Sequence, residues 1–158
     1  MTYAEWQTQQ HEKRSKLHRK LLSWGMVPDQ VVSYFNFDNM SKYETDYCGL
    51  YETKTKCHDI PSLNCYNCGC PYFKVIDNPQ PDLQGNKVES ICTINSSYSK
   101  IFTVNGIIHC DCSGCTIPHT VKSAKTHLEK LEVSDTYSIL ELIRNFQLSD
   151  ILGRLKVF

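Results

Sequence analysis

The sequence has no apolar run long enough to cross a membrane, and its first residues, MTYAEWQTQQHEKR, lack the apolar segment of a signal peptide. A membrane-spanning helix needs about 20 apolar residues. We therefore expect a cytoplasmic protein without a membrane anchor. An excess of one charge is also missing, because 17 basic and 17 acidic side chains cancel. No overall field drives such a chain toward nucleic acid or a membrane surface.

The motifs of common catalytic folds are missing as well. The sequence contains no glycine-rich phosphate loop, nucleophile elbow or evident carboxylate pair. Cys57 and His58 are neighbours, but adjacent side chains on an extended chain point in different directions, and no third orienting group is evident. The sequence therefore leaves open whether the protein is an enzyme.

A length of 158 residues favours one domain over residues 1–158. We expect an α+β fold with a small irregular metal-centred core and a short β-hairpin, flanked by N- and C-terminal helices. The parts are a helical segment (1–40), a cysteine-rich metal-binding core (41–119) and a second helical segment (120–158).

Periodic apolar residues predict the individual elements. A helix over 3–24 ends at Gly25, and a shorter one begins at Pro28. Asn105-Gly106 between apolar residues predicts the hairpin. Ser134 or Asp135 is expected to cap a C-terminal helix. Beyond that cap, four residues at helical spacing predict a core face, or alternatively a surface for a protein partner: Leu148, Ile151, Leu152 and Leu155.

All nine cysteines lie between Cys48 and Cys115. Cytosolic thiols stay reduced, and an odd number would leave one unpaired, so a disulfide framework is disfavoured. Metal ligation explains the concentration of thiols better. Too few apolar residues surround them for the middle segment to order itself without metal.

Two paired motifs carry the strongest signal. In Cys65-Tyr-Asn-Cys68-Gly-Cys70 the spacing lets two thiolates face one ion, and the glycine relieves the tight turn. Cys112 and Cys115 form a second pair, four residues before His119. The two pairs together predict a four-coordinate site. Further donors exceed the needs of one ion, so two sites or one multinuclear cluster are alternatives: Cys48, Cys57, His58 and Cys92.

The spacing does not separate two kinds of cofactor. Paired cysteines with a terminal histidine suit tetrahedral zinc, whereas a Cys-x-x-Cys-x-Cys triplet also suits an iron–sulfur cluster. Zinc predicts a structural or binding module, which we favour. An iron–sulfur cluster with an open iron predicts redox or Lewis-acid chemistry.

From Cys48 to about Leu131 the chain resembles the cysteine-rich small domain, a zinc-finger-like family of bacterial and archaeal proteins presumed to bind metal. The matching blocks are Cys57-His58, Asn64-Cys65-x-x-Cys68-x-Cys70-Pro71-x-Phe73 and Asp111-Cys112-Ser113-x-Cys115-x-x-Pro118-His119. The resemblance implies eight thiolate ligands, with His58 and His119 as further candidates: Cys48, Cys57, Cys65, Cys68, Cys70, Cys92, Cys112 and Cys115. Cys110 lies outside the pattern.

One stretch could meet a charged partner. Residues 11–20, HEKRSKLHRK, place five basic side chains against one glutamate on the expected first helix. Such a run is usually a solvated face, and contact with nucleic-acid phosphates is the alternative.

Overall fold

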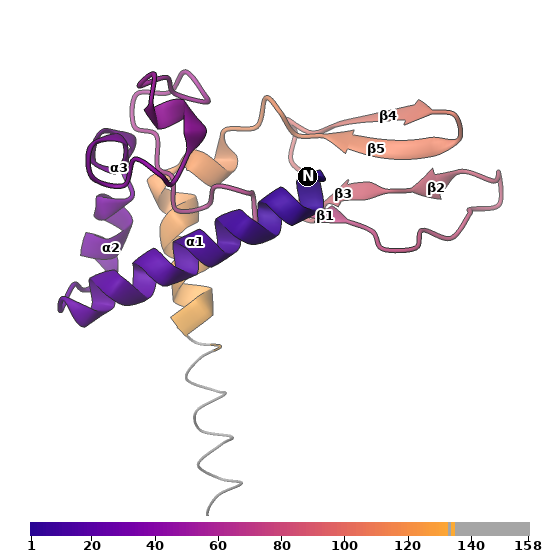
Figure 1. Ribbon diagram of the computed structural model, residues 1–158. Coiled ribbons are helices and arrows are strands. Elements are labelled where there is room, and N and C mark those ends of the chain that lie inside the picture. Colours follow the sequence, from indigo (N-terminus) through magenta and orange to yellow (C-terminus); the bar gives the residue numbers. More distant parts are fainter. Residues whose placement is uncertain (133, 135–158) are drawn as a thin grey trace, which may run out of the picture. The chain divides into compact units, whose positions relative to one another are not determined.

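The computed structural model describes residues 1–132 and residue 134 (Figure 1). The chain divides into two compact units, Met1–Ala124 and Lys125–Phe158. The first unit contains every cysteine and all five strands. The expectation of one domain over 1–158 stays a prediction, and the apolar stripe that begins at Leu148 lies outside the described residues.

Helix α1 spans Tyr3–Ser23, as the apolar spacing predicts. Thr2 and Glu5 form a capping box, because the Glu5 amide donates to Thr2 Oγ1 at 3.3 Å and the Thr2 amide donates to Glu5 Oε2 at 2.7 Å. Gly25, with a φ of +83°, follows the helix at its other end. These signals are local, which is why the sequence alone identifies this helix.

Two short helices follow. Helix α2, Pro28–Tyr34, starts at the predicted proline. Helix α3, Phe37–Tyr43, begins after Asn36, whose side chain accepts the Asp38 amide. The sequence analysis missed α3 because only two of its seven residues are buried, too few to show a period. A 3-10 turn, η1, spans Gly49–Tyr51.

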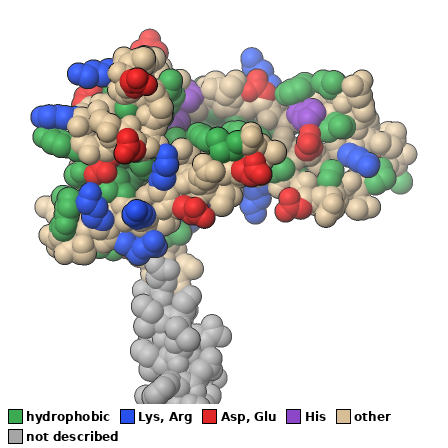
Figure 2. Space-filling model, viewed as in Figure 1, with side chains coloured by type: hydrophobic (Ala, Val, Ile, Leu, Met, Phe, Trp, Pro, Cys, Tyr) green, Lys and Arg blue, Asp and Glu red, His purple; other side chains and the backbone are tan. Residues whose placement is uncertain are grey.

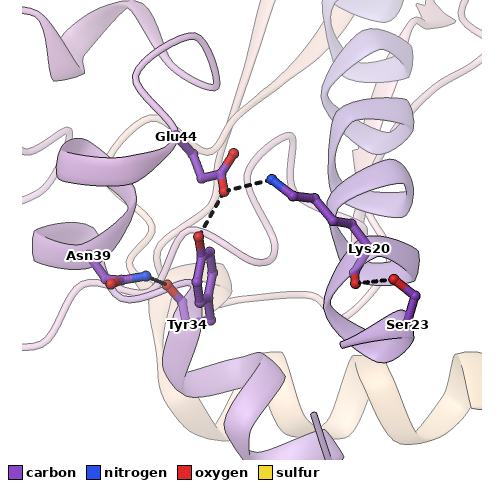
Figure 3. A network of polar contacts seen from close by, with 5 residues as sticks. All are labelled: Lys20, Ser23, Tyr34, Asn39 and Glu44. Carbon is purple, nitrogen blue, oxygen red and sulfur yellow. Dashed lines mark hydrogen bonds and ion pairs between the residues drawn. The ribbon is translucent and has the colours of Figure 1, made fainter. Parts of the chain in front are cut away.

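A polar network joins these helices (Figure 3). Glu44, directly after α3, accepts a hydrogen bond from the Tyr34 hydroxyl at 2.8 Å and pairs with the Lys20 ammonium of α1 at 3.6 Å. Asn39 Nδ2 donates to the Tyr34 carbonyl at 2.8 Å. One carboxylate therefore links the end of α3 to both other helices.

The hydrophobic core lies among these helices and the loop that carries the first cysteines. It contains four aromatic or aliphatic residues from that loop as well as helical ones: Leu17, Leu21, Val31, Val32, Phe35, Phe37, Met40, Tyr47, Tyr51, Leu63 and Tyr66. The rings of Phe35 and Tyr66 meet edge to face, with centroids 5.0 Å apart. The expectation that too few apolar residues surround the cysteines underestimated this contribution, because buried tyrosines supply much of it.

Five short strands lie at the other end of this unit (Figure 1). They are β1 (Phe73–Val75), β2 (Lys87–Val88), β3 (Ser90–Cys92), β4 (Lys100–Val104) and β5 (Ile107–Asp111). Strands β1 and β3 pair antiparallel, and β5 lies between β4 and β2. The predicted hairpin is β4–β5, where Asn105 and Gly106 both have positive φ.

The hairpin has little apolar cover. All five residues of β4 are exposed, Ile101, Phe102 and Val104 among them, and only Cys110 of β5 is buried. Figure 2 shows hydrophobic side chains at the surface of this end of the unit.

The helical C-terminal part begins at residue 121, next to the predicted start at 120 and well before the expected caps, Ser134 and Asp135. Residues 121–132 are helical, and Thr120 Oγ1 accepts the Ser123 amide at 3.1 Å. Ser134 is itself helical and therefore does not cap, while Asp135 lies outside the described residues. The fold is α+β with helices at both ends, as expected. Within the described residues, no helix is long and apolar enough to cross a membrane.

Candidate metal centre

The ten predicted metal-binding side chains line two cavities of the first unit. The larger cavity, about 440 Å³, is lined by all of them except Cys65. Cys65 lines a smaller one of about 20 Å³. Both cavities share the same four donors: Cys48, Cys57, Cys68 and His119. Donors spread over 72 positions of sequence are thus gathered in one region.

The first cysteine pair is held by the helical core. The Cys68 amide donates to the Cys65 carbonyl at 3.1 Å, which closes a turn. The Cys65 amide donates to the Phe35 carbonyl at 2.7 Å, and Asn64 Nδ2 donates to the Val32 carbonyl at 2.7 Å. These hydrogen bonds hold the turn against α2 without any help from a bound ligand.

At Gly69 the chain changes direction, so that Cys70 has different neighbours from Cys65 and Cys68. Its φ is +81°, a conformation that other residues rarely adopt. A Cβ at this position would lie 3.2 Å from Gln10 Cβ of α1. Helix α1 packs directly on the turn, and Gln7 Nε2 lies 2.9 to 3.0 Å from the carbonyl oxygens of Gly69, Cys70 and Phe73.

The second pair forms the same kind of turn at the end of β5. The Cys115 amide donates to the Cys112 carbonyl at 3.0 Å, and Asp111 Oδ1 accepts the Ser113 amide at 2.8 Å. Two residues on, the 3-10 turn η2 (Ile117–His119) brings His119 toward the first pair. The Asn64 amide donates to the His119 carbonyl at 2.9 Å and fixes that approach.

Cys57, His58 and His119 have ligand atoms within 4.8 Å of one another. Cys57 Sγ lies 3.2 Å from His58 Nδ1 and 3.9 Å from His119 Nε2. A tetrahedral zinc ion with bonds of about 2.0–2.3 Å places its donors about 3.3–3.8 Å apart. The three donors are therefore close to ligating distance.

Backbone carbonyls set the orientation of both rings. His119 Nδ1 lies 3.2 Å from the Asn64 carbonyl oxygen, and His58 Nε2 lies 3.1 Å from that of Ser113. A carbonyl only accepts, so each of these nitrogens carries a proton. The other nitrogen of each neutral ring is left with a lone pair, and it is the one near Cys57. A carbonyl bonded to the distal nitrogen is the usual support of a metal-binding histidine.

Burial keeps His119 neutral. The pKa of this side chain is lowered to about 4, chiefly by burial and secondly by the neighbouring His58, while the Asn64 carbonyl acts in the opposite direction. Near pH 7 the ring is therefore in the unprotonated form that a metal requires.

The thiols fall into two groups, according to which neighbouring thiols raise the pKa of each. The pKa of Cys65 and of Cys68 is raised to about 12, chiefly by burial, with the nearby Cys48 and Cys57 acting in the same direction. We define the first group as Cys48, Cys57, Cys65 and Cys68, with His58 and His119 beside them. Without metal, Cys65 and Cys68 are protonated near neutral pH, so a metal ion that binds them must displace their protons.

The second group surrounds Cys112. Burial raises the pKa of Cys112 and Cys70, and the neighbours that raise it further are thiols of this group. We define the second group as Cys70, Cys92, Cys110, Cys112 and Cys115. Ser96 joins two members, because its amide donates to Cys92 Sγ at 3.4 Å and its hydroxyl lies 3.5 Å from Cys115 Sγ.

The two Cys-x-x-Cys pairs thus lie in different groups, whereas one interpretation of the sequence expected them to share an ion. Gly69 causes the separation, since it directs Cys68 and Cys70 to different neighbours. Cys110, left outside the predicted set, also lines the larger cavity, with its Sγ 3.4 Å from Cys112 Sγ. The sequence signal that could have included Cys110 in the predicted set is its position in the hairpin, directly before the Cys112–Cys115 pair.

The aromatic residues among the cysteines divide between two roles. Tyr72 and Phe73 line the larger cavity and Tyr51 the smaller, as expected of residues that shield a metal from water. Tyr47 and Tyr66 instead belong to the helical core.

The basic run 11–20 is only partly a solvated face. Arg14 is buried, and Lys13 Nζ donates to the carbonyls of Asp46 and Tyr47 at 2.9 and 3.3 Å. Lys20 pairs with Glu44, so three of the five basic side chains are engaged within the first unit.

Comparison with known proteins adds no relative. No family model, curated protein or solved structure matches the chain. The resemblance to the cysteine-rich small domain therefore stays a prediction that rests on the quoted motifs.

Proposed function

We propose that this protein binds two zinc ions through cysteine thiolates, one in each group, and that the loaded centres form a structural or binding module. The observation that supports the proposal best is the arrangement of Cys57, His58 and His119. Three soft or borderline donors converge, and hydrogen bonds already hold both rings in the metal-binding tautomer.

The chemistry of the donors favours zinc. Thiolate and imidazole together suit zinc, while calcium and magnesium take oxygen ligands. Iron–sulfur clusters are held mainly by thiolates, so the two imidazoles of the first group favour zinc over that alternative. In the second group the five thiols exceed the four that one zinc ion takes. The resemblance leaves Cys110 outside its ligand pattern, so we take Cys110 as the spare thiol.

Metal ligation also requires reduced thiols. All nine cysteines are free in this structure. Since cytosolic thiols are kept reduced, we place the protein in the cytoplasm.

Metal and acid-labile sulfide analysis of anaerobically purified protein tests the proposal. Wild type should contain two zinc ions and no sulfide. Cys68→Ser and Cys115→Ser should each lose about one ion, whereas the matched control Cys110→Ser should keep both. A folded protein without metal would overturn the proposal. Iron with stoichiometric sulfide would establish the alternative, a small iron–sulfur protein.

A further inference from the structure

Arg14 of α1 is a buried cation with unpartnered N–H donors. Its side chain is 6% exposed, and neither Nε nor Nη1 has a partner among the described residues. Its Cζ lies 5.7 Å from the centre of the Tyr66 ring. A ring face offsets part of a cation's desolvation, but it leaves the N–H donors unsatisfied.

A carboxylate partner is also missing from the described part of the chain. Neither the Lys20–Glu44 pair nor the His109–Glu89 pair involves Arg14. An arginine keeps its charge at physiological pH, and a buried charge without a counter-charge is strongly unfavourable. A fold that buries Arg14 therefore calls for negative charge nearby.

Three neighbouring groups could supply that charge: Tyr66, Tyr47 and Cys68. A tyrosine is neutral near pH 7, because its ordinary pKa is about 10. A cysteine differs, because a bound metal takes its proton and leaves a thiolate. Cys68 is thus the neighbour that becomes negative when a metal binds.

The packing of α1 agrees with this assignment. Gln7 and His11 contact the Gly69 carbonyl, and Gln10 faces the Gly69 Cα. Arg14 follows Gln10 by one helical turn, and both side chains are buried. The face of α1 that holds the turn after Cys68 is therefore the face that carries the cation.

We propose that Arg14 is the internal counter-ion of a negatively charged metal–thiolate centre that contains Cys68. This inference rests on the proposed function, since it requires metal in the first group. It also specifies the class of centre. Zn²⁺ with three thiolates carries one net negative charge and with four carries two, whereas two thiolates and two imidazoles give a neutral site. The cation favours the thiolate-rich sets, in which Cys68 is joined by other thiolates of the first group and at most one of the two histidines beside Cys57 binds the same ion.

Three variants test the role of the charge: Arg14→Met removes it at similar length, Arg14→Lys keeps it, and Arg19→Met removes an exposed charge from the same helix. Zinc affinity is measured by competition with a chelator. The thiolate-to-metal charge-transfer absorbance of the cobalt-loaded protein reports the number of bound thiolates. We expect Arg14→Met to bind about 10- to 100-fold more weakly at one of two sites, with reduced charge-transfer absorbance. Arg14→Lys should stay within a few-fold of wild type, and Arg19→Met should equal it.

The outcomes separate the inference from the function on which it rests. A wild type without metal refutes the proposed function itself. A wild type that binds two ions, with Arg14→Met binding both equally well, overturns the inference alone. Equal weakening in Arg14→Met and Arg14→Lys also overturns it, because shape rather than charge would then matter.

Discussion

Replacing Tyr66 tests whether the helical core holds the first cysteine pair. Tyr66 lies between Cys65 and Cys68, is fully buried and packs edge to face on Phe35. Truncating a buried aromatic residue to alanine costs about 3–5 kcal/mol. Domains of this size are stable by only about 5–15 kcal/mol. Tyr66→Ala should therefore remove a large share of the free energy of unfolding.

Tyr66→Phe separates packing from hydrogen bonding. The Tyr66 hydroxyl lies 2.8 Å from His18 Nδ1, and losing one such bond costs about 1 kcal/mol. Tyr66→Phe should thus be mild. Tyr43→Ala, at a residue that is 60% exposed, should change the free energy of unfolding by no more than about 0.5 kcal/mol.

The assay is chemical denaturation of the zinc-loaded protein, together with chelator competition on the same samples. Because metal binding and folding are linked, Tyr66→Ala should lose both stability and zinc affinity. If Tyr66→Ala unfolds at the wild-type denaturant concentration, the helical core does not support the cysteine pair and the reasoning fails.

Three further predictions concern the support of the metal groups. Gln7→Ala should lower the free energy of unfolding by about 1–3 kcal/mol in a denaturation experiment, because it removes the donor that faces three carbonyl oxygens. The control Gln9→Ala, at an exposed residue, should be neutral, and equal denaturation midpoints for the two variants would contradict this prediction. Gly69→Ala should lower the free energy of unfolding by about 1–3 kcal/mol, because Gly69 has a positive φ and contacts α1. Gly114 has open space around its Cα, so Gly114→Ala should be tolerated. Similar losses of stability in both variants would contradict the argument from backbone strain. Chelating the metal should raise amide hydrogen exchange in β4 and β5 more than in α1, and a uniform rise would argue against separate support.

Local signals made part of this structure predictable. Helix α1 has a capping box at Thr2 and a glycine at its end, and the hairpin has Asn105-Gly106, so neighbouring residues determine both. The Cys-x-x-Cys turns are equally local, because each is closed by one backbone bond within four residues.

The assignment of thiols to two groups was not predictable in the same way. It depends on how the loop with Cys48 and Cys57 and the strand with Cys92 fold back onto the two turns, and these contacts span tens of residues. Spacing alone shows that Cys65 and Cys68 act together. It does not show that Cys70, two residues later, belongs with Cys115.

The two groups rest on different supports, and this decides how metal and folding are coupled in each. Cys65 and Cys68 are fastened to a core that includes Phe35 and Tyr66, so packing alone contributes to their placement. The second group instead lies beside short strands whose apolar residues are exposed in β4 and only partly buried in β5, and small sheets without a buried face are marginal in water. If the proposed zinc binds there, the thiolates of Cys70, Cys92, Cys112 and Cys115 would supply cross-links between these strands. Metal would then have the larger structural task in the second group, whereas packing already helps to place the first group, which would be closer to a preformed site.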